Sequence, residues 1–453
     1  MLRNLPSDRT VTAPPSLDQR RLVGDRGVMA SRVRVLSPLY VEGGPLEQVD
    51  ADLGPRNKHF LFVTAPFGGL SAEVGRQLRL KGARVTRVLL SAGDILDWGT
   101  EQAVFYRDRP EAWSGWISDH IKAEGVTDLI VFGDSHPYAI DAMAAARAHG
   151  AKLHVLEEGY FRPHWITLER DGVNGSSTLS KDPEFYRRQA GLHSAKPFVP
   201  VGRITPAAVR RISAYHTLQY LGLAIFPHYR TPNPYTPLQQ AAGHVRRYAR
   251  QRLSAQRYQA DLHSVLGVSG PIFLALLQRP GDSQLLRHSK LKTMDAFIEL
   301  VVTSFAAHAP PEARLLFKAH PLDHGVEAHD VIVRRAAEAC GVADRVFYTD
   351  VGHFPSLVRA SVGVISVNST GGLTAIEFQQ PTIALGSAIY DMPGLTHQGG
   401  LASFWSAPEA PDPGLFHAFR SVVMARTQIN GAYSTSHGVR LAAPEVAERI
   451  LTA

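Results

Sequence analysis

The stretch from residue 314 to residue 386 limits the fold of this chain more than any other part of the sequence. It contains three short apolar segments with the length of buried strands, Leu315–Lys318, Val362–Ser366 and Thr382–Leu385. Polar turns and one strongly helical segment, Leu373–Gln379, lie between them. Apolar strands that alternate with helices and polar turns are typical of a parallel α/β sheet. We therefore expect such a sheet in the C-terminal half of the chain.

Polar residues follow the first two of these predicted strands directly. His320 and Pro321 come after the first strand, and an Asn-Ser-Thr-Gly-Gly turn at 368–372 follows the second and opens the helix. Ligands of open α/β sheets bind in the crevice at the carboxyl ends of the strands. The first N–H groups of a helix have no partner within the helix and can hold an anion. The sequence therefore predicts a site for a phosphorylated ligand here.

The alternation of strands and helices continues through most of the chain. Because 453 residues exceed the usual size of one hydrophobic core, two domains are expected. We predict an α/β fold with two Rossmann-like domains that face each other across a cleft, as in the GT-B class of nucleotide-sugar transferases. The predicted division is a disordered leader at 1–54, an acceptor-binding domain at 55–262, a nucleotide-sugar-binding domain at 263–430 and a closing helix at 431–453.

The remaining elements are predicted from the same patterns. Two segments differ from the rest: residues 170–215 look rich in loops, and the Gly-rich segment 390–400 looks mobile. The other predicted strands are 59–63, 85–89, 129–132, 153–156 and 272–277, and the other predicted helices are 71–81, 140–149, 215–226, 292–307, 415–425 and 443–451.

Composition excludes several classes of protein. No window approaches 18 consecutive apolar residues, so no membrane span is expected, and the N-terminus lacks the apolar core of a secretory signal. The single cysteine, Cys340, rules out an intrachain disulfide and a cysteine-based metal cage. We therefore expect a cytoplasmic protein without a bound metal. The net charge of +7 suits an anionic substrate or a membrane surface.

Two other short motifs favour ordinary structural roles or substrate contact. The Asp50-Ala51-Asp52 triplet resembles a metal-binding DxD motif, but it lies in polar sequence ahead of the first strand and is expected to be a solvated turn. The turn at 65–69 lacks a full GxGxxG pattern, so a dinucleotide site is not expected. Its glycines, Gly68 and Gly69, are interpreted as letting an acceptor or sugar approach the backbone.

Acidic, histidine and arginine groups follow two predicted strands of the N-terminal half. Asp134 and His136 follow strand 129–132, where capping of the turn and of the next helix is an equally good interpretation. Glu157, Glu158 and Arg162 follow strand 153–156. Two adjacent carboxylates at the end of a buried strand are costly unless they are solvated or paired. At least one of them is therefore expected to be functional.

Residues 244–258 form a predicted helix with a basic pattern. It carries Arg246, Arg247, Arg250, Arg252 and Arg257, and it follows the apolar helix predicted at 215–226. One interpretation is a core helix followed by a solvated basic face. The other is docking on anionic lipid. Nucleic acid is not expected as a partner, because no nucleic-acid-binding signature is present.

Four motifs together resemble a known family. LEEGYFRPHWITLERDGVN, LALLQRPGDSQL, KAHPLD and SVNSTGGLTAIEF are similar to the bacterial capsule polysaccharide biosynthesis and export proteins, the β-Kdo transferases of the KpsS/KpsC type. The resemblance covers most of residues 55–430 and is closer to the single-module KpsS (LipB-like) branch than to the duplicated KpsC branch. It implies two GT-B-like domains, the donor CMP-β-Kdo, and transfer of Kdo onto a lysophosphatidylglycerol terminus that begins the linker of a capsular polysaccharide.

The resemblance also implies roles for individual residues. The catalytic Asp of the family lies in a Q-x-x-G-D turn, which here places Asp282 as the nucleophile of a retaining, double-displacement reaction. The E-D/E-G turn corresponds to Glu157-Glu158-Gly159, where this chain has Glu in place of the Asp of KpsC-like modules. Glu158 or Glu157 would deprotonate the acceptor hydroxyl. The other expected contacts are His320, Pro321, Ser369, Thr370, Gly371, Gln278 and Lys318 at the nucleotide, and Asp134, His136, Arg162 and Arg279 at the acceptor or substrate.

A CMP leaving group needs no diphosphate-bound metal, so no cofactor is expected beyond the donor CMP-Kdo. The expected partners are an anionic lysophospholipid acceptor, the inner face of the cytoplasmic membrane, where the protein would be peripherally associated, and other capsule assembly proteins. Two alternatives remain open. One is a GT-B transferase that uses another nucleotide sugar, such as a UDP-linked one, and the other is a non-catalytic scaffold that binds polysaccharide or lipid.

Overall fold

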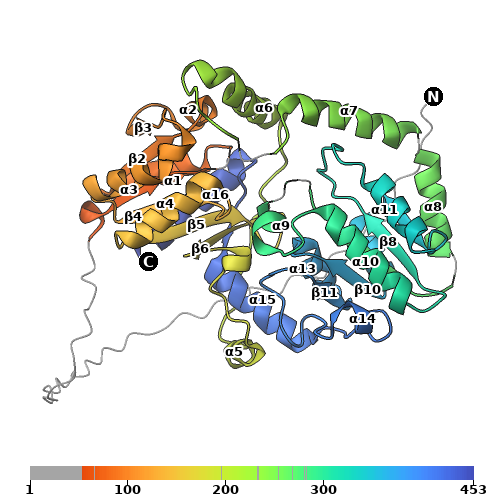
Figure 1. Cartoon of the computed structure of the whole chain (residues 1–453). Helices are drawn as coiled ribbons and strands as arrows, with labels where there is room; N and C mark the ends of the chain where they lie inside the picture. The colour runs from red at the N-terminus through yellow and green to blue at the C-terminus, as the bar shows by residue number, and fades with distance from the viewer. Residues whose placement is uncertain are drawn as a thin grey trace, which may run out of the picture. The chain divides into compact units, whose positions relative to one another are not determined.

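A computed structural model describes most of the chain from residue 54 to residue 453 (Figure 1). The predicted leader at 1–54, with its Asp50-Ala51-Asp52 triplet, lies outside the described residues except for Gly54. Asp282, the predicted nucleophile, also lies outside them. The other undescribed positions are Pro66, Ala195, Pro232, Asn233, Ser254, Val268 and Pro280, and only the backbone is described at Pro237, Ala255, Arg257, Tyr258, Ala260, Asp261, Ser283 and Gln284.

The first of two sheets in the described part of the chain has seven strands in the order β12-β6-β5-β4-β1-β2-β3. Strands β1 to β5 are parallel, whereas β6 is antiparallel to β5 and β12 is antiparallel to β6. The predicted parallel strands are confirmed, and β3, β6 and β12 were not predicted. The bounds are β1 His59–Phe62, β2 Arg84–Leu89, β3 Ala103–Phe105, β4 Asp128–Phe132, β5 Lys152–Glu158, β6 Trp165–Arg170 and β12 Gln428–Asn430.

Helices cover both faces of this sheet. On one face, Trp113 and Met143 pack with the strand residue Val131 in one apolar cluster. On the other face, Val74 and Ile450 pack with Phe62 in a second cluster. The helices are α1 Leu70–Leu80, α2 Ala92–Trp98, α3 Trp113–Ala123, α4 Pro137–Ala148 and, from the C-terminus, α16 Ser436–Leu451, with 3₁₀ turns η1 Pro55–Asn57, η2 Pro110–Ala112 and η3 Asn174–Ser176.

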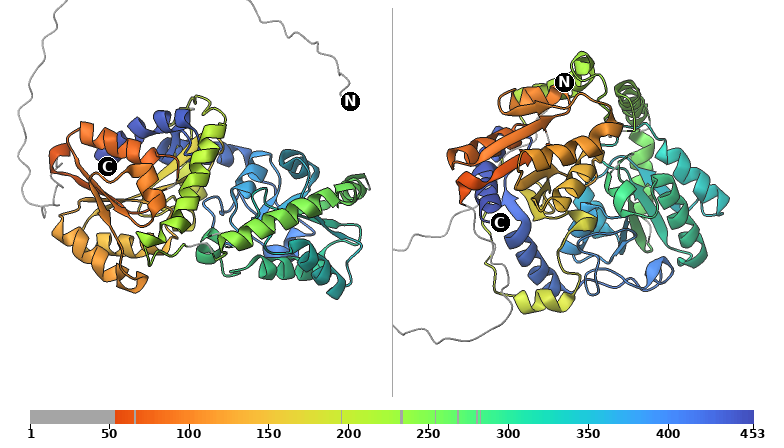
Figure 2. Two further views of the ribbon diagram at one scale, coloured as in Figure 1. Left: turned by 90° about the horizontal axis from the view of Figure 1, so that it is seen from above. Right: turned by 60° about the vertical axis from the view of Figure 1, so that its left-hand side comes forward.

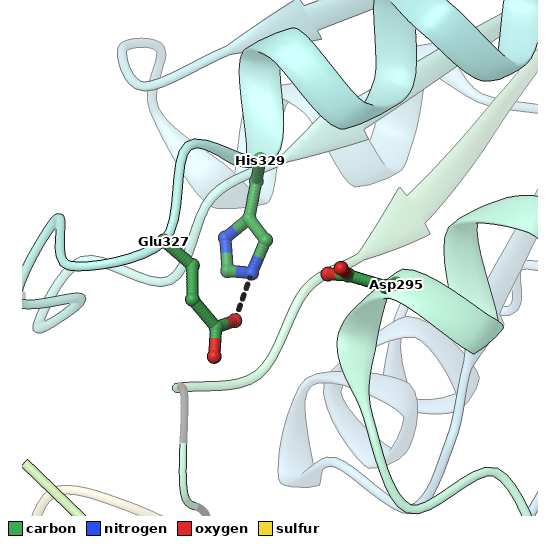
Figure 3. A group of neighbouring side chains, drawn as sticks. All are labelled: Asp295, Glu327 and His329. Carbon is green, nitrogen blue, oxygen red and sulfur yellow. Dashed lines mark hydrogen bonds and ion pairs between the residues drawn. The ribbon is translucent and has the colours of Figure 1, made fainter.

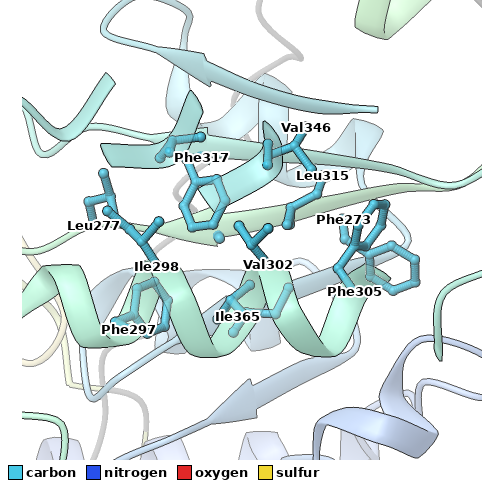
Figure 4. Packing of buried hydrophobic residues seen from close by; sticks show 14 of the residues in the cluster. Phe273, Leu277, Phe297, Ile298, Val302, Phe305, Leu315, Phe317, Val346 and Ile365 are labelled. Carbon is cyan, nitrogen blue, oxygen red and sulfur yellow. The ribbon is translucent and has the colours of Figure 1, made fainter. Parts of the chain in front are cut away.

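The second sheet has five strands in the order β11-β10-β7-β8-β9, and all of its pairs are parallel. Helix α10 packs on it through Phe297, Val301 and Phe305, which meet Phe273 and Phe317 of the strands (Figure 4). The predicted parallel sheet is confirmed, and β9 was not predicted. The bounds are β7 Ile272–Leu276, β8 Arg314–Lys318, β9 Val346–Thr349, β10 Gly363–Ser366, β11 Thr382–Ala384, α9 Ser283–His288, α10 Met294–His308, α11 His329–Ala339, α12 Phe354–Ala360, α13 Thr370–Glu377 and α14 Gly400–Phe404.

The segment between the sheets is more helical than the sequence suggested. The prediction of a loop-rich 170–215 is confirmed in part: residues 177–182 and 196–205 contain no helix or strand, whereas α5 and the first ten residues of α6 lie in this segment. The Thr205 side chain accepts a hydrogen bond from the Ala208 N–H, and Pro206 stands at the first helical position, so α6 begins earlier than residue 215. The elements are α5 Pro183–Gln189, α6 Pro206–Leu221, η4 Gly222–Ala224, α7 Pro237–Leu253 and α8 Ala255–Gly267.

The chain returns to the first sheet at its C-terminal end. Helix α15, Pro413–Thr427, leads into β12, which pairs with β6, and α16 then packs on α1. The chain is therefore already back in the first sheet before residue 430, the border suggested by the sequence. None of the helices that the structure describes is long and apolar enough to cross a membrane.

The expectation of a mobile loop at 390–400 was wrong. Tyr390, Met392 and Leu395 are buried and pack with Phe419 and Val423 of α15 in one apolar cluster. Apolar side chains at every second or third position hold this Gly-containing segment against the helix. The segment is therefore part of the core.

Candidate functional site

The carboxyl edge of the second sheet brings together the turns that the sequence singled out. Strands β10, β7 and β8 are neighbours, so the turns at 368–370, 278–282 and 320–321 follow three adjacent strands. The connection after β7 leads to β8 and the connection after β10 leads to β11, in opposite directions, which makes the gap between β7 and β10 the switch point of the sheet. There the Gln278 amide donates to Asn368 Oδ1 at 3.0 Å, and the Asn368 N–H donates to Gln278 Oε1 at 3.4 Å.

Helix α13 begins at this switch point. Ser369 is its N-cap, and the Ser369 hydroxyl oxygen accepts a hydrogen bond from the Gly371 N–H at 3.1 Å. A Cβ atom at Gly371 would lie 2.8 Å from Leu276 Cδ1, so the helix approaches β7 too closely for a larger residue. Thr370 lines two neighbouring cavities. The start of α13 is therefore fixed against the strand, with Thr370 at the surface of a pocket.

His320 follows β8 and is electrically neutral. Burial, together with the charges of Arg279 and Arg162, lowers the pKa of His320 to about 4. Its Nδ1 accepts a hydrogen bond from the Leu322 N–H at 3.0 Å. The ring proton therefore lies on Nε2, which is left as a donor. Arg279 comes from the second sheet and Arg162 from the first, so cationic groups of both sheets lie near this donor.

Arg247 of α7 holds the turn that carries His320. The guanidinium donates to the carbonyl oxygens of His320 at 3.1 Å and Pro321 at 3.2 Å, and to that of Asp323. It also pairs with Asp350 Oδ1 at 3.1 Å, and both side chains of this pair are nearly buried. Arg247 was predicted only as part of a basic helix. The local sequence pattern does not predict its contact with the 320–323 turn.

Lys318 stabilises the same region from β8. Its Nζ donates to the carbonyl oxygens of Ala319 at 3.0 Å and Asp350 at 3.3 Å, and the side chain is buried. Burial lowers the pKa of Lys318. These contacts hold the ammonium group within the chain, whereas its predicted contact with the nucleotide stays a prediction.

Three carboxylates gather at the carboxyl edge of the first sheet. Asp134 follows β4, whereas Glu157 and Glu158 are the last two residues of the adjacent strand β5, which therefore runs two residues beyond the predicted 153–156; a Cβ atom on Gly133 would lie 3.3 Å from Glu157 Oε2. Burial raises the pKa of Glu157 to about 7, and the charges of Glu158 and Asp134 act in the same direction, although the Glu158 N–H donates to Glu157 Oε1 at 2.9 Å. Glu158 is exposed. Glu157 thus titrates near neutral pH, which suits a general base.

Asp134 is tied to the second-sheet part of the chain through His288. The His288 side chain is 7% exposed and the Asp134 side chain is fully buried, and His288 Nε2 lies 3.4 Å from Asp134 Oδ1. Burial alone would raise the pKa of Asp134, but the hydrogen bonds with His288 and nearby serines hold it below its usual value. His288 ends α9, the helix that follows residue 282, and no sequence motif marked it. The pair therefore links the end of α9 to the carboxylates of the first sheet.

Two predicted substrate residues have structural partners. His136 is the N-cap of α4, and its Nδ1 accepts a hydrogen bond from the Tyr138 N–H at 3.2 Å. Burial lowers the pKa of His136 to about 4. Gly68 is approached by the protein itself, because a Cβ atom there would lie 2.0 Å from the Tyr433 carbonyl oxygen. These observations favour the capping interpretation of His136 and leave no room for a sugar at Gly68.

A cavity of about 200 Å³ lies beside the start of α13. The first-sheet part of the chain contributes aromatic rings and Arg162, and the second-sheet part contributes one face of α13. Arg420, from α15, pairs with Glu377 at 3.5 Å and lies over the Phe161 ring. The lining residues are Tyr160, Phe161, Arg162, His164, Trp165, Phe198, Thr370, Leu373, Thr374, Glu377 and Arg420.

One group of side chains has the composition of a metal site, although the sequence predicted none. Asp295, Glu327 and His329 place their ligand atoms within 4.8 Å of one another (Figure 3). Burial would lower the pKa of His329, but its hydrogen bonds and ion pairs with Asp323 and Glu327 raise it to about 9. A protonated imidazole has no lone pair for a metal. At neutral pH the group is therefore an ion-pair network that fixes the loop after His320.

The raised pKa of Glu157 gives a stability prediction. The unfolded carboxyl has an ordinary pKa, so between about pH 4.5 and 7 the folded state binds more protons and stability falls as pH rises. The Glu157→Gln side chain does not titrate, so the variant lacks this loss of stability with rising pH. The quantity to measure is the melting temperature of the variant minus that of the wild type. We expect this difference to be larger at pH 8 than at pH 5, by about 2 °C or more. Glu312→Gln, at an exposed position outside this group of carboxylates, provides the control and should keep the wild-type pH dependence; equal behaviour of the two variants would contradict the assignment.

Two α/β sheets built mainly of parallel strands, with a helix start at the switch point of one and carboxylates at the edge of the other, form an α/β fold of the GT-B-like class. Within that class, a model of the family described as capsule polysaccharide biosynthesis protein matches residues 127–433. The chain belongs to this family.

Sequence relatives agree with this assignment. The capsule polysaccharide export protein KpsS of Escherichia coli is 32% identical over 380 residues, which cover 83% of this chain and 97% of that protein. The capsule polysaccharide modification protein LipB of Neisseria meningitidis serogroup B is 32% identical over 392 residues, with 83% and 91% covered. The structure of the KpsC β-Kdo 2,7 transferase of Thermosulfurimonas dismutans is 13% identical, with a TM-score of 0.40 and 87% and 99% covered.

Proposed function

We propose that this protein is a retaining β-Kdo transferase that moves Kdo from CMP-β-Kdo to an anionic, lysophosphatidylglycerol-type acceptor. The observation that carries the proposal is that His320, after β8, and the start of α13, after β10, lie at the same edge of the second sheet, with carboxylates at the edge of the other sheet. His320 Nε2–H and the first N–H groups of α13 would hold the phosphate of CMP. Arg279 and Arg162 would offset the charge of the Kdo carboxylate and the phosphate.

The reaction has two steps in this proposal. In the first, the Asp282 carboxylate forms a bond to the anomeric carbon of Kdo, and the bond from that carbon to the CMP phosphate oxygen breaks with its electron pair leaving on CMP. In the second, the acceptor hydroxyl attacks the same carbon, Asp282 leaves as a carboxylate, and Glu157 or Glu158 takes the hydroxyl proton. Two inversions give retention. Because Glu157 titrates near pH 7, transfer should increase as pH rises through 7.

A lipid acceptor would require the protein to work at the inner face of the cytoplasmic membrane. The cavity beside Thr370 fits the acceptor in this scheme, because it joins aromatic rings with the cationic Arg162 and Arg420. Aromatic faces accommodate both sugar rings and acyl chains, whereas the guanidinium groups bind phosphate. Other proteins of capsule assembly are the expected consumers of the product.

The direct test is to incubate the purified protein with CMP-Kdo and a short-chain lysophosphatidylglycerol and to analyse the products by mass spectrometry. We expect the acceptor mass to increase by one Kdo residue and CMP to be released. A thermal-shift comparison of CMP with UDP tests the donor, because a ligand that binds only the native state raises its stability. Stabilisation by UDP alone would replace the donor assignment, and absence of turnover with every acceptor would favour a scaffold.

A further inference from the structure

Helix α7 is amphipathic, but unlike an ordinary surface helix it turns its apolar side chains to solvent. Its polar stripe faces the protein. Gly243, Arg246, Arg247 and Arg250 follow the i, i+3, i+4, i+7 spacing of one helix face. Arg247 is buried under the His320 turn, Arg246 donates to carbonyl oxygens of the 325–326 loop, and Arg250 pairs with Asp330.

Close packing fixes this orientation of the helix. A Cβ atom on Gly243 would lie 2.5 Å from the His324 carbonyl oxygen, so only glycine allows α7 to approach the loop. The arginine contacts of α7 therefore hold it from one side, and the helix cannot rotate to bury its other face without breaking them. Arg246, Arg247 and Arg250 are used internally, which corrects the interpretation of this whole helix as a free basic surface.

The opposite stripe of α7 is apolar and points to solvent. Leu238, Val245 and Leu253 recur at intervals of seven and eight residues, and they are 82%, 70% and 87% exposed. Tyr248, on the same side, is 58% exposed, with the Arg252 guanidinium over its ring at 5.0 Å. Figure 2 (left) shows α7 along the outside of the molecule.

The charge around the stripe is one-sided. Residues 203–260 contain nine arginines and no Asp, Glu or Lys; Arg211, Arg230, Arg247 and Arg250 pair with carboxylates elsewhere in the chain, whereas Arg252, whose guanidinium lies over the Tyr248 ring, is exposed. More than half of the exposed large hydrophobic side chains among the described residues also lie between residues 204 and 266. A soluble partner surface of ordinary composition would offer both signs of charge, whereas an anionic bilayer offers negative charge over an apolar interior. Repulsion between arginine-rich surfaces disfavours a second copy of the chain as the occupant.

We propose that the exposed stripe of α7 inserts into the surface of an anionic lipid bilayer. Leu238, Val245, Tyr248 and Leu253 would enter the boundary between headgroups and acyl chains, and Arg252 would meet the lipid phosphates. Arg247 joins α7 to the His320 turn, so the bilayer lies next to the element that holds the candidate nucleotide site. Docking does not depend on the transfer reaction, so vesicle binding and turnover can succeed or fail independently.

The test is co-sedimentation of the full chain with vesicles of phosphatidylcholine alone and of phosphatidylcholine mixed with phosphatidylglycerol. We expect binding to the mixed vesicles to be at least about tenfold stronger than to the neutral ones, and to weaken as salt is added. The triple variant Leu238→Ser, Val245→Ser, Leu253→Ser should bind the mixed vesicles at least about tenfold more weakly than the wild type.

A matched control removes three exposed leucines elsewhere: Leu80→Ser, Leu96→Ser and Leu300→Ser should leave binding unchanged. Both triple variants should keep the wild-type circular dichroism, and the salt titration of the wild type tests the proposal even if one variant misfolds. Three results would overturn the proposal: no sedimentation with either vesicle, equal binding to neutral vesicles, or a wild-type dimer in light scattering that the α7 variant converts to a monomer.

Discussion

Asp282→Asn is expected to lower the rate of Kdo transfer at least about a thousandfold, while the protein still binds CMP. The amide keeps the size of the side chain but is a poor nucleophile, so no covalent sugar intermediate can form. In the sequence, residue 282 comes six residues after the end of the central strand β7 and four after Gln278, which hydrogen-bonds to Asn368.

Intact-protein mass spectrometry separates a loss of the nucleophile from a loss of binding. Wild type with CMP-Kdo and no acceptor should gain the mass of one Kdo residue, and Asp282→Asn should not, although CMP should still raise its melting temperature. The control is Asp344→Asn. Asp344 is exposed and precedes β9, so it lies at the amino end of a strand, away from the carboxyl edge of the second sheet. A fully active Asp282→Asn variant would remove Asp282 from the mechanism.

Arg247→Ala is expected to cause the largest loss of stability together with a loss of nucleotide binding. It removes the donors to three carbonyl oxygens of the 320–323 turn and leaves the nearly buried Asp350 carboxylate without its partner. Breaking a buried pair from one side costs about 3–5 kcal/mol. The His320 turn would then lose its support, so we expect the dissociation constant for CMP to rise at least about tenfold.

Arg252→Ala is the matched control for this change. Arg252 lies on the same helix and is exposed, and its guanidinium contacts the Tyr248 ring, so its removal should change stability by less than about 1 kcal/mol. Urea unfolding and calorimetric titration with CMP measure the two effects. If Arg247→Ala and Arg252→Ala behaved alike, the role of Arg247 as the support of the turn would be refuted.

Much of the second sheet could be predicted from its sequence, because buried parallel strands are nearly continuous apolar runs. Leu315–Lys318 and Thr382–Leu385 match β8 and β11 within one residue. The polar turns after β10, β7 and β8 were also recognisable, since residues at strand ends need no packing partner and keep their functional chemistry. Short or half-exposed strands gave no such signal: Ala103–Phe105 has three residues and only partly buried side chains.

Contacts between distant segments could not be predicted. The support of His320 by Arg247 spans 73 residues, and the pairing of His288 with Asp134 spans 154. An arginine on a basic helix has the same local pattern whether it faces solvent or a carbonyl group. The segment 390–400 was similarly ambiguous, because its glycines suggested mobility while the burial of Tyr390 and Met392 depends on α15, which follows it in the sequence.

The late return of the chain to its first sheet has a consequence for synthesis. Val74 and Leu78 of α1 are covered by Val446 and Ile450 of α16, and the edge of β6 is paired by β12, more than 250 residues downstream of it. A nascent chain on the ribosome therefore exposes this apolar face and this strand edge until translation is nearly complete. A chain that stops before residue 428 would expose them permanently, which makes premature termination a route to aggregation and proteolysis.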